Sequence, residues 1–216
     1  MCGIIAAASN RNVGKLLVQG LHKMEYRGYD SAGIALHQND RIAHLRTLGK
    51  VKLLEERMIK EKPKSKLGIA HTRWATHGEP SEENAHPHKS NERVYIVHNG
   101  IIENYLDLKD FLKREGYSFS SQTDSELIAH LLDYFLNQGN SMLDSMYLSK
   151  EKLDGAYAIA AIDRENDKNI IIARSKSPLL IGIGIDEILA ASDPLALGQV
   201  TNEFIFLEDG DVAELC

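Results

Sequence analysis

Cysteine and tryptophan are scarce in this 216-residue chain, which contains two cysteines and a single tryptophan. The cysteines, Cys2 and Cys216, stand at opposite ends of the sequence. So few cysteines exclude a disulfide-rich scaffold, and proteins without such a scaffold are typical of reducing compartments. The composition therefore predicts a cytoplasmic location.

Long apolar runs and an excess of positive charge are also missing. No stretch approaches the roughly 18 consecutive apolar residues of a membrane-spanning helix, and no signal-peptide pattern follows Met1. The formal net charge is -6 at pH 7, and lysines and arginines often stand beside acidic residues. Binding to a membrane or to nucleic acid is therefore not expected.

The remaining composition is that of an ordinary globular protein, 43% apolar and 26% charged, long enough for one large domain or two small ones. Apolar spacing predicts helices over 13–24, 51–60, 105–115 and 142–152. Strands are predicted over 3–8, 32–37, 42–48, 67–72, 93–98, 156–163, 169–174, 179–184, 187–191, 203–207 and 211–215. Two of the later strands are apolar on both faces and need cover on both sides, which indicates a layered α+β arrangement.

Three local patterns give sharper predictions. Residues 123–126 (TDSE) form a capping-box signature for a helix that continues through Phe135. Segments 164–168 and 208–210 are expected to be hairpin turns. Segment 73–92 is polar and lacks periodicity, which predicts a long loop of a kind that is uncommon unless it is functional or disordered.

Cys2 is the most informative residue, because only an initiator methionine precedes it. If Met1 is removed, the chain begins with a cysteine that carries its thiol and a free α-amine on adjacent carbons, Cβ and Cα. Their reference pKa values are about 8.5 and about 7.7–8.0, so the amine can accept the proton of the thiol. Such a residue is a nucleophile with its own general base. The alternative is a small apolar residue that opens a buried strand.

Four segments support the nucleophile hypothesis when they are combined with Cys2. They are 26–33 (YRGYDSAG), 71–78 (HTRWATHG), 98–104 (HNGIIEN) and 123–126 (TDSE). Together with Cys2 they resemble the glutamine amidotransferases that use an N-terminal cysteine. Within that family the similarity is greatest to the glutaminase domain of the glucosamine-6-phosphate synthases.

This resemblance extends over essentially the whole chain and implies a fold. The expected fold is the α+β N-terminal-nucleophile sandwich of four layers, with two antiparallel sheets between helical layers. Residues 1–216 would form one type-2 glutamine amidotransferase domain, and the sugar isomerase domains of the complete synthase would be absent from this chain.

Glutamine is a zwitterion, so a site that selects it needs a cation for its α-carboxylate and an anion for its α-ammonium group. Arg73 suits the first task because a guanidinium group binds a carboxylate through paired hydrogen bonds. Asp124 matches the family residue that holds the ammonium group. The alternatives are a surface arginine and an ordinary acidic residue at a helix N-terminus.

Asn99 and Gly100 are the predicted oxyanion donors. The side-chain N–H of Asn99 and the main-chain N–H of Gly100 would stabilise the charge that develops on the amide oxygen. An Asn-Gly pair after a strand is more commonly a plain turn. The segment that follows, 101–104, completes the family motif and favours the catalytic role.

Other residues receive roles only from the resemblance. Arg27 matches a residue that helps to fix the terminal cysteine. Trp74, Thr76 and His77 match a loop that lines and covers the glutamine site, and the ring of Trp74 could shield a thioester from water.

The histidines invite a metal hypothesis, because five of them lie between positions 71 and 98: His71, His77, His86, His88 and His98. They do not form a His-Glu-x-x-His pattern, and structural zinc sites usually include cysteine. We expect no metal and no cofactor.

The function expected from the resemblance is hydrolysis of L-glutamine to L-glutamate and ammonia through a γ-glutamyl thioester on Cys2. The complete enzyme would pass this ammonia to an isomerase domain, which converts fructose 6-phosphate to glucosamine 6-phosphate, and it would form a homodimer or a higher homo-oligomer. The main alternative is the glutaminase domain of amidophosphoribosyltransferase, asparagine synthetase or glutamate synthase. A histidine-rich metal-binding module and an amidase with another substrate also remain open.

Overall fold

A computed structural model of the chain describes residues 2–74 and 78–216. Its larger sheet has seven strands in the order β11-β9-β10-β1-β4-β2-β3, with antiparallel pairing throughout. These strands are β1 (Gly3–Ser9), β2 (Ser31–Gln38), β3 (Arg41–Leu48), β4 (Leu67–Arg73), β9 (Leu180–Gly184), β10 (Glu187–Ala191) and β11 (Phe204–Phe206).

The smaller sheet has five strands in the order β12-β8-β7-β6-β5, also antiparallel. They are β5 (His88–Ser90), β6 (Val94–Ile102), β7 (Gly155–Asp163), β8 (Asn166–Ser175) and β12 (Val212–Leu215). The α-helices of the described residues are α1 (Gly14–Met24), α2 (Val51–Glu61), α3 (Tyr105–Arg114), α4 (Glu126–Leu136) and α5 (Met142–Lys150). The described residues also form two short 3-10 helices, η1 (Glu25–Arg27) and η2 (Pro194–Ala196).

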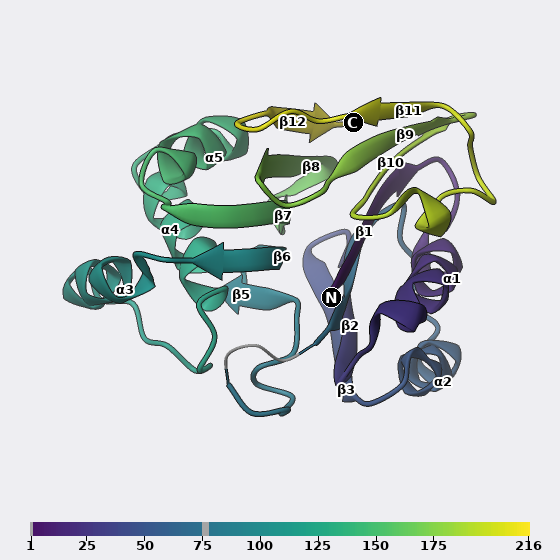
Figure 1. Cartoon of the computed structure of the whole chain (residues 1–216), viewed down its shortest axis with the longest axis horizontal. Helices are drawn as coiled ribbons and strands as arrows, with labels where there is room; N and C mark the ends of the chain where they lie inside the picture. The colour runs from purple at the N-terminus through teal and green to yellow at the C-terminus, as the bar shows by residue number, and fades with distance from the viewer. Residues whose placement is uncertain (1, 75–77) are drawn as a thin grey trace.

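The two sheets pack face to face between two helical layers, with α1 and α2 on one side and α3, α4 and α5 on the other (Figure 1). Strand β1 shows how the sequence produces these layers. Ile5 belongs to the core beneath α1 and α2, whereas Ile4 belongs to the core between the sheets, because successive side chains of a strand point to opposite faces. The predicted four-layer α+β sandwich is confirmed, and strands that are apolar on both faces are explained by their cover on both sides.

Some local predictions were wrong because tertiary pairing overrides local pattern. The predicted loop 73–92 contains β5, which pairs with β6. Strand β6 does not end at residue 98 but continues through Asn99 and Gly100 to Ile102. The predicted hairpin at 208–210 is not one, because β11 and β12 belong to different sheets.

The capping box at 123–126 is also absent from the structure. Helix α4 begins at Glu126 with Ser125 as its N-cap, and the Ser125 side chain makes no capping hydrogen bond. Glu126 instead accepts main-chain N–H groups of Ser120 and Ser121 at 2.8 and 2.6 Å. Burial opposes ionisation of Glu126, but the His130 ring, 3.6 Å from its Oε1, and the hydrogen bonds from this segment hold the pKa of its carboxyl below its usual range. The motif therefore fixes the loop that precedes α4.

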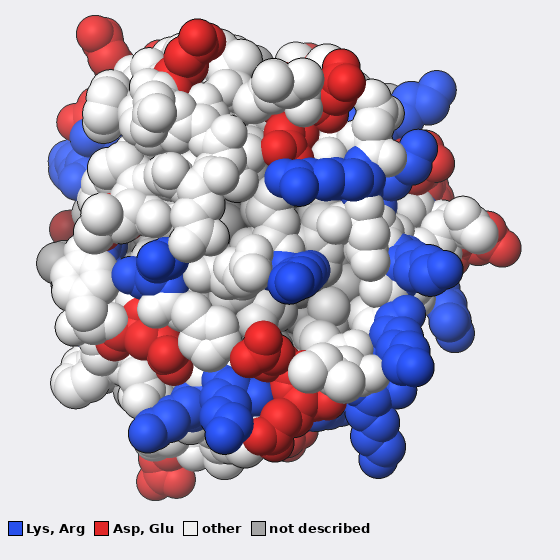
Figure 2. Space-filling view, turned by 90° about the vertical axis from the view of Figure 1, so that its right-hand side faces the viewer, with Lys and Arg blue, Asp and Glu red and all other residues white. Residues whose placement is uncertain are grey.

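Charged side chains of both signs occur over the face that carries α1 and α2, and several Lys and Arg side chains adjoin one another along one edge of it (Figure 2). Among the described residues, none of the helices combines the length and apolarity required to cross a bilayer.

Candidate active site

Cys2 directly precedes β1 and lies beside the end of β4. The register pairs Gly3 with Thr72, which brings the cysteine next to Arg73 and Trp74. Its sulfur accepts the main-chain N–H of Trp74 at 3.2 Å, and the thiol donates to the Trp74 carbonyl oxygen at 3.5 Å. Burial raises the pKa of the Cys2 thiol, and the Trp74 N–H opposes this shift. The proton of the thiol therefore needs a nearby acceptor before the sulfur can attack.

Asn99, on β6 of the five-stranded sheet, contacts Cys2. Its side-chain Nδ2 donates to the carbonyl oxygen of Cys2 at 3.2 Å, and its Oδ1 lies 2.9 Å from Nε2 of His71. The predicted nucleophile and the predicted amide donor are therefore neighbours, although 97 positions separate them in the sequence.

Gly100 occupies a position in β6 that no other residue would fit. Its φ is +134°, and a Cβ atom added to it would lie 1.9 Å from the carbonyl oxygen of Ala156 on β7. Such a separation is far below any normal contact, so a side chain here would displace β7 from β6. The glycine thus keeps the Asn99–Gly100 main chain against its neighbouring strand.

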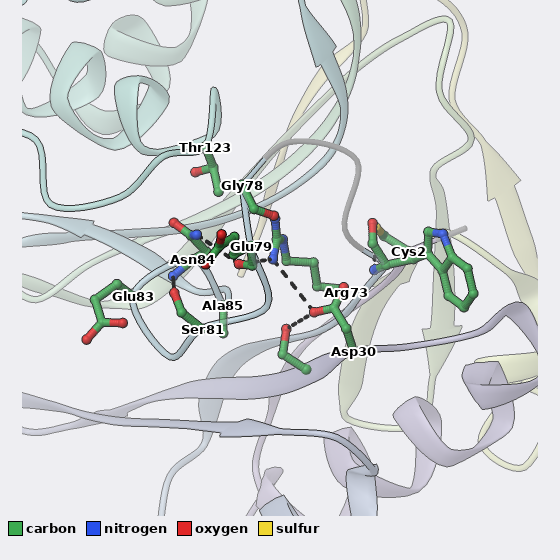
Figure 3. Close-up of polar contacts among 12 residues, drawn as sticks. Cys2, Asp30, Arg73, Gly78, Glu79, Ser81, Glu83, Asn84, Ala85 and Thr123 are labelled. Carbon is green, nitrogen blue, oxygen red and sulfur yellow. Dashed lines mark hydrogen bonds and ion pairs between the residues drawn. The ribbon is translucent and has the colours of Figure 1, made fainter.

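Arg73 is buried at the end of β4 with 4% of its surface exposed. Its guanidinium group lies 3.7 Å from Oδ1 of Asp30 and donates to the carbonyl oxygens of Gly78 and Glu79 at 3.1 and 3.4 Å (Figure 3). These contacts fix a cation within the site. The alternative of a surface arginine is therefore wrong.

The segment that contributes these carbonyl groups is itself held in place. Asn84 donates to the Glu79 carbonyl oxygen at 2.9 Å and accepts the main-chain N–H of Gln122 at 2.8 Å (Figure 3 shows Asn84 beside Glu79). Residues 78–84 are thus joined to the loop before α4, which carries Asp124.

Asp124 is buried, with Oδ2 accepting the main-chain N–H of Ile102 at 2.8 Å. It lies in the loop before α4 rather than in the first turn of the helix, so the prediction of an ordinary first-turn acid does not describe its position.

The predicted nucleophile, cation, anion and glycine donor all line one small pocket. Its lining is Cys2, Arg73, Trp74, His86, His98, Gly100, Thr123, Asp124 and Ser125. Larger hollows near Asn10, Lys66 and Asp167 contain none of the predicted site residues. The smaller pocket is therefore the candidate site, because the predicted nucleophile and the two predicted charged groups line it.

Of the remaining predicted residues, Trp74 lines the pocket and Arg27 does not. Arg27 forms an ion pair with Asp193 at 2.8 Å, and Tyr26 donates to the same carboxylate oxygen at 2.6 Å. Trp74 is half-exposed and its ring covers Gly28, where an added Cβ would come within 2.4 Å of the ring. Thr76 and His77 lie outside the described residues.

Four histidines close to the site are buried: His71, His86, His88 and His98. Burial lowers the pKa values of His71 and His88 to about 3, so both rings are neutral at pH 7. In the described part of the chain, no group of three or more His, Cys, Asp or Glu residues has the arrangement to hold a metal ion.

Sequence reasoning missed the partners that hold the site residues. Asp30 contacts Arg73, Asp193 contacts Arg27, and His71 contacts Asn99. The sequence contains no local signal for these pairs, since each one joins two elements that only the fold brings together.

A family model described as a glutamine amidotransferase domain matches residues 71–199, which is more than half of the chain. The chain belongs to this glutamine amidotransferase family. Its sequence is 52% identical over its full length to glutamine–fructose-6-phosphate aminotransferase [isomerizing] from Haemophilus ducreyi and to the protein of the same name from Haemophilus influenzae. The match covers 35% of each relative, so this domain spans about a third of their length.

The fold of this amidotransferase domain also matches solved structures. Glutamine phosphoribosylpyrophosphate amidotransferase from B. subtilis, solved in complex with ADP and GMP, superimposes with a TM-score of 0.84 at 26% identity. The match covers 99% of this chain and 47% of that chain. These similarities confirm the N-terminal-nucleophile fold, and the family disfavours the metal-binding module.

Replacing Gly100 with alanine should impair both the fold and the site, because the new methyl group would meet the Ala156 carbonyl oxygen. Gly116→Ala is the matched control: Gly116 also has a positive φ, +92°, but an added Cβ would meet nothing within 4 Å. The control should cost about 1–2 kcal/mol of unfolding free energy from backbone strain alone. Chemical denaturation should show a larger loss for Gly100→Ala, and equal losses would contradict the close approach.

Proposed function

We propose that this domain hydrolyses L-glutamine to L-glutamate and ammonia, with Cys2 as the nucleophile. The observation that carries the proposal is the convergence of Cys2, Gly100, Arg73 and Asp124 on one pocket, with Asn99 bonded to Cys2. Each group matches one requirement of amide transfer from an amino acid.

The first step activates the sulfur. Removal of Met1 would free the α-amine of Cys2, which then takes the proton of the thiol. Because burial raises the pKa of the Cys2 thiol, its deprotonation depends on a nearby base, and the α-amine of the same residue is such a base. The products of this transfer are a thiolate and an ammonium group on the same residue.

The thiolate then attacks the side-chain amide carbon of glutamine. A C–S bond forms, and the π electron pair of the carbonyl moves to oxygen. The N–H groups of Asn99 and Gly100 would donate to this oxyanion. To do so, Nδ2 of Asn99 would replace its hydrogen bond to the Cys2 carbonyl oxygen with one to the oxyanion. Loss of one such donor typically costs about 2.7–4 kcal/mol of transition-state stabilisation.

The tetrahedral species collapses when its C–N bond breaks. The ammonium group of Cys2 protonates the departing nitrogen, which leaves as ammonia, and a γ-glutamyl thioester remains. The same amine, now neutral, takes a proton from water as the oxygen of that water attacks the thioester. Cleavage of the C–S bond releases glutamate and regenerates the thiol.

Substrate selection rests on the two charged groups of the pocket. Arg73 would bind the α-carboxylate of glutamine, and Asp124 would bind the α-ammonium group. Trp74, Thr76 and His77 would line and cover the bound substrate, and Arg27 would hold the start of the chain in place. An amidase for other amides would not need this pair of opposite charges.

We also infer how the ammonia is used. The relatives at 52% identity are named for fructose 6-phosphate, so the acceptor proposed here is fructose 6-phosphate, converted to glucosamine 6-phosphate by an isomerase domain beyond these 216 residues. The proposed location is the cytoplasm, consistent with the free thiols of Cys2 and Cys216, and the proposed assembly is a homodimer or a higher homo-oligomer.

The second candidate is an amidophosphoribosyltransferase, which is favoured by the structural similarity to the B. subtilis enzyme. The fate of the amide nitrogen distinguishes the two. When the protein that carries this domain is given glutamine labelled with 15N in its amide, the label should appear in glucosamine 6-phosphate made from fructose 6-phosphate. Label in phosphoribosylamine made from phosphoribosylpyrophosphate would instead establish the second candidate.

Cys2→Ala should abolish glutamine hydrolysis and leave glutamine binding largely intact, because the nucleophile is lost while Arg73 and Asp124 remain. Cys216→Ala is the matched control and should retain full activity, since Cys216 is exposed and does not line the pocket. Glutamate release should be measured together with the intact mass, which reports whether Met1 has been removed. Turnover by Cys2→Ala, or by protein that retains Met1, would contradict the mechanism.

Arg73→Gln should raise the KM for glutamine by roughly 10- to 100-fold, as expected for the loss of charged hydrogen bonds worth about 1.5–3 kcal/mol. Arg11→Gln provides a control, because Arg11 is a largely exposed arginine whose partner is Glu187. Initial rates over a range of glutamine concentrations, with a check of folding by circular dichroism, test this prediction. A normal KM for Arg73→Gln would remove Arg73 from the carboxylate site.

A further inference from the structure

A buried histidine of the seven-stranded sheet contacts the side chain of Asn99. His71 lies on β4, is 1% exposed, and places its Nε2 atom 2.9 Å from Oδ1 of Asn99. The same amide places its Nδ2 atom 3.2 Å from the carbonyl oxygen of Cys2. The contact between His71 and Asn99 has no part in the reaction steps given above.

The direction of this contact matters because an asparagine amide has two opposite ends. A rotation by 180° exchanges a hydrogen-bond donor for an acceptor. If Oδ1 of Asn99 faced the reacting carbonyl, it would repel the oxyanion. A donor on the other side of the amide prevents this rotation, since only Oδ1 can accept its hydrogen bond.

The ring of His71 is arranged to be that donor. Burial lowers the pKa of His71 to about 3, although the bond with Asn99 opposes the shift, so the ring is neutral at pH 7 and carries one N–H. Its Nδ1 atom makes no hydrogen bond of normal geometry with the described residues, whereas Nε2 lies 2.9 Å from Oδ1 of Asn99. The main chain of His98 also acts on this ring and, like Asn99, opposes the lowering of its pKa. A proton on Nε2 forms the hydrogen bond to Oδ1 of Asn99 and leaves only the Nδ1 lone pair without a partner, whereas a proton on Nδ1 would leave two acceptors facing each other.

A second histidine fixes the plane of that ring. His86 stacks on His71 with centroids 4.1 Å apart and planes 19° from parallel. Nδ1 of His86 accepts the main-chain N–H of His98, the residue before Asn99, at 3.2 Å. The absence of a side chain at Gly33 lets the main chain of His86 approach β2, because an added Cβ would lie 2.0 Å from the His86 carbonyl oxygen.

We propose that His71 is a positioning residue that, as the neutral Nε2–H tautomer, locks the Asn99 amide with Nδ2 directed at the oxyanion. The proposal rests on the glutaminase function proposed above. It assigns His71 an effect on the chemical step rather than on glutamine binding, because it acts on a group that bonds the transition state.

Three substitutions separate hydrogen-bond donation from packing. Glutamine places its amide nitrogen near the position of a histidine Nε2, asparagine near that of Nδ1, and phenylalanine retains a ring without any donor. His71→Phe should lower kcat by about 10- to 100-fold with little change in KM, up to the loss expected for one missing oxyanion donor. His71→Gln should recover most of kcat, and His71→Asn should not.

His37→Phe is the matched control, since His37 is also buried and its Nε2 lies 2.8 Å from a main-chain carbonyl oxygen, that of Arg164. It should lose stability and keep its kcat. A kcat for His71→Phe within about twofold of the parent would overturn the proposal, and so would equal activity of His71→Gln and His71→Asn.

Combination with Asn99→Ala distinguishes positioning from a general structural effect. If His71 acts through Asn99, His71→Phe should cause no further loss of kcat in the Asn99→Ala background. Full additivity of the two losses would mean that His71 acts independently of Asn99, which contradicts the inference.

A readout that does not depend on turnover tests the same geometry. The 15N spectrum of the histidine rings at pH 7 should show a protonated Nε2 and an unprotonated Nδ1 for His71. An Nδ1–H tautomer would overturn the positioning role even in an active enzyme. A parent protein that shows the Nε2–H tautomer but does not hydrolyse glutamine would contradict the proposed function and leave the predicted orientation supported.

Discussion

The contact between the start of β1 and the middle of β6 is the constraint on which the site depends. Cys2 directly precedes β1 of the seven-stranded sheet, Asn99 lies in β6 of the five-stranded sheet, and a hydrogen bond of 3.2 Å joins them. The apolar core between the sheets, which includes Ile4 and Val97, sets the separation of these strands. In the proposed mechanism, packing of ordinary aliphatic side chains therefore determines whether the Cys2 sulfur and the Asn99 amide can reach the carbon and the oxygen of the same substrate amide.

The polar groups of the site are buried, and each one needs partners to offset the cost of leaving water. Arg73 is held by Asp30 and by main-chain carbonyl oxygens, and Asp124 accepts a main-chain N–H group. Neutral histidine rings pack next to Asn99, where burial of a charged side chain would cost free energy. These partners hold the polar groups of the site in place, which would reduce the reorganisation that the proposed reaction requires.

Much of the fold could be predicted from the sequence, because alternation and helical spacing report directly on burial. The apolar positions of 13–24 predicted α1, and Gly116 marked the end of α3. The family and the residues around the pocket followed from long motifs. Predictions failed where contacts beyond the local sequence determine the structure. Strands β11 and β12 pair with strands of different sheets, so they form no hairpin. Glu126 binds the residues that precede it instead of capping α4. The bond between His71 and Asn99 likewise depends on two strands that the sequence does not connect.

The central claim is that a sulfur at the start of the chain attacks an amide whose oxygen faces Asn99 and Gly100. The most direct test is a crystal structure of the protein lacking Met1 after reaction with a glutamine analogue that carries an electrophilic carbonyl group on its side chain. We predict a covalent bond to Sγ of Cys2, with the carbonyl oxygen about 2.7–3.1 Å from Nδ2 of Asn99 and from the Gly100 nitrogen. An adduct on another residue, or a carbonyl oxygen directed away from these donors, would contradict the account.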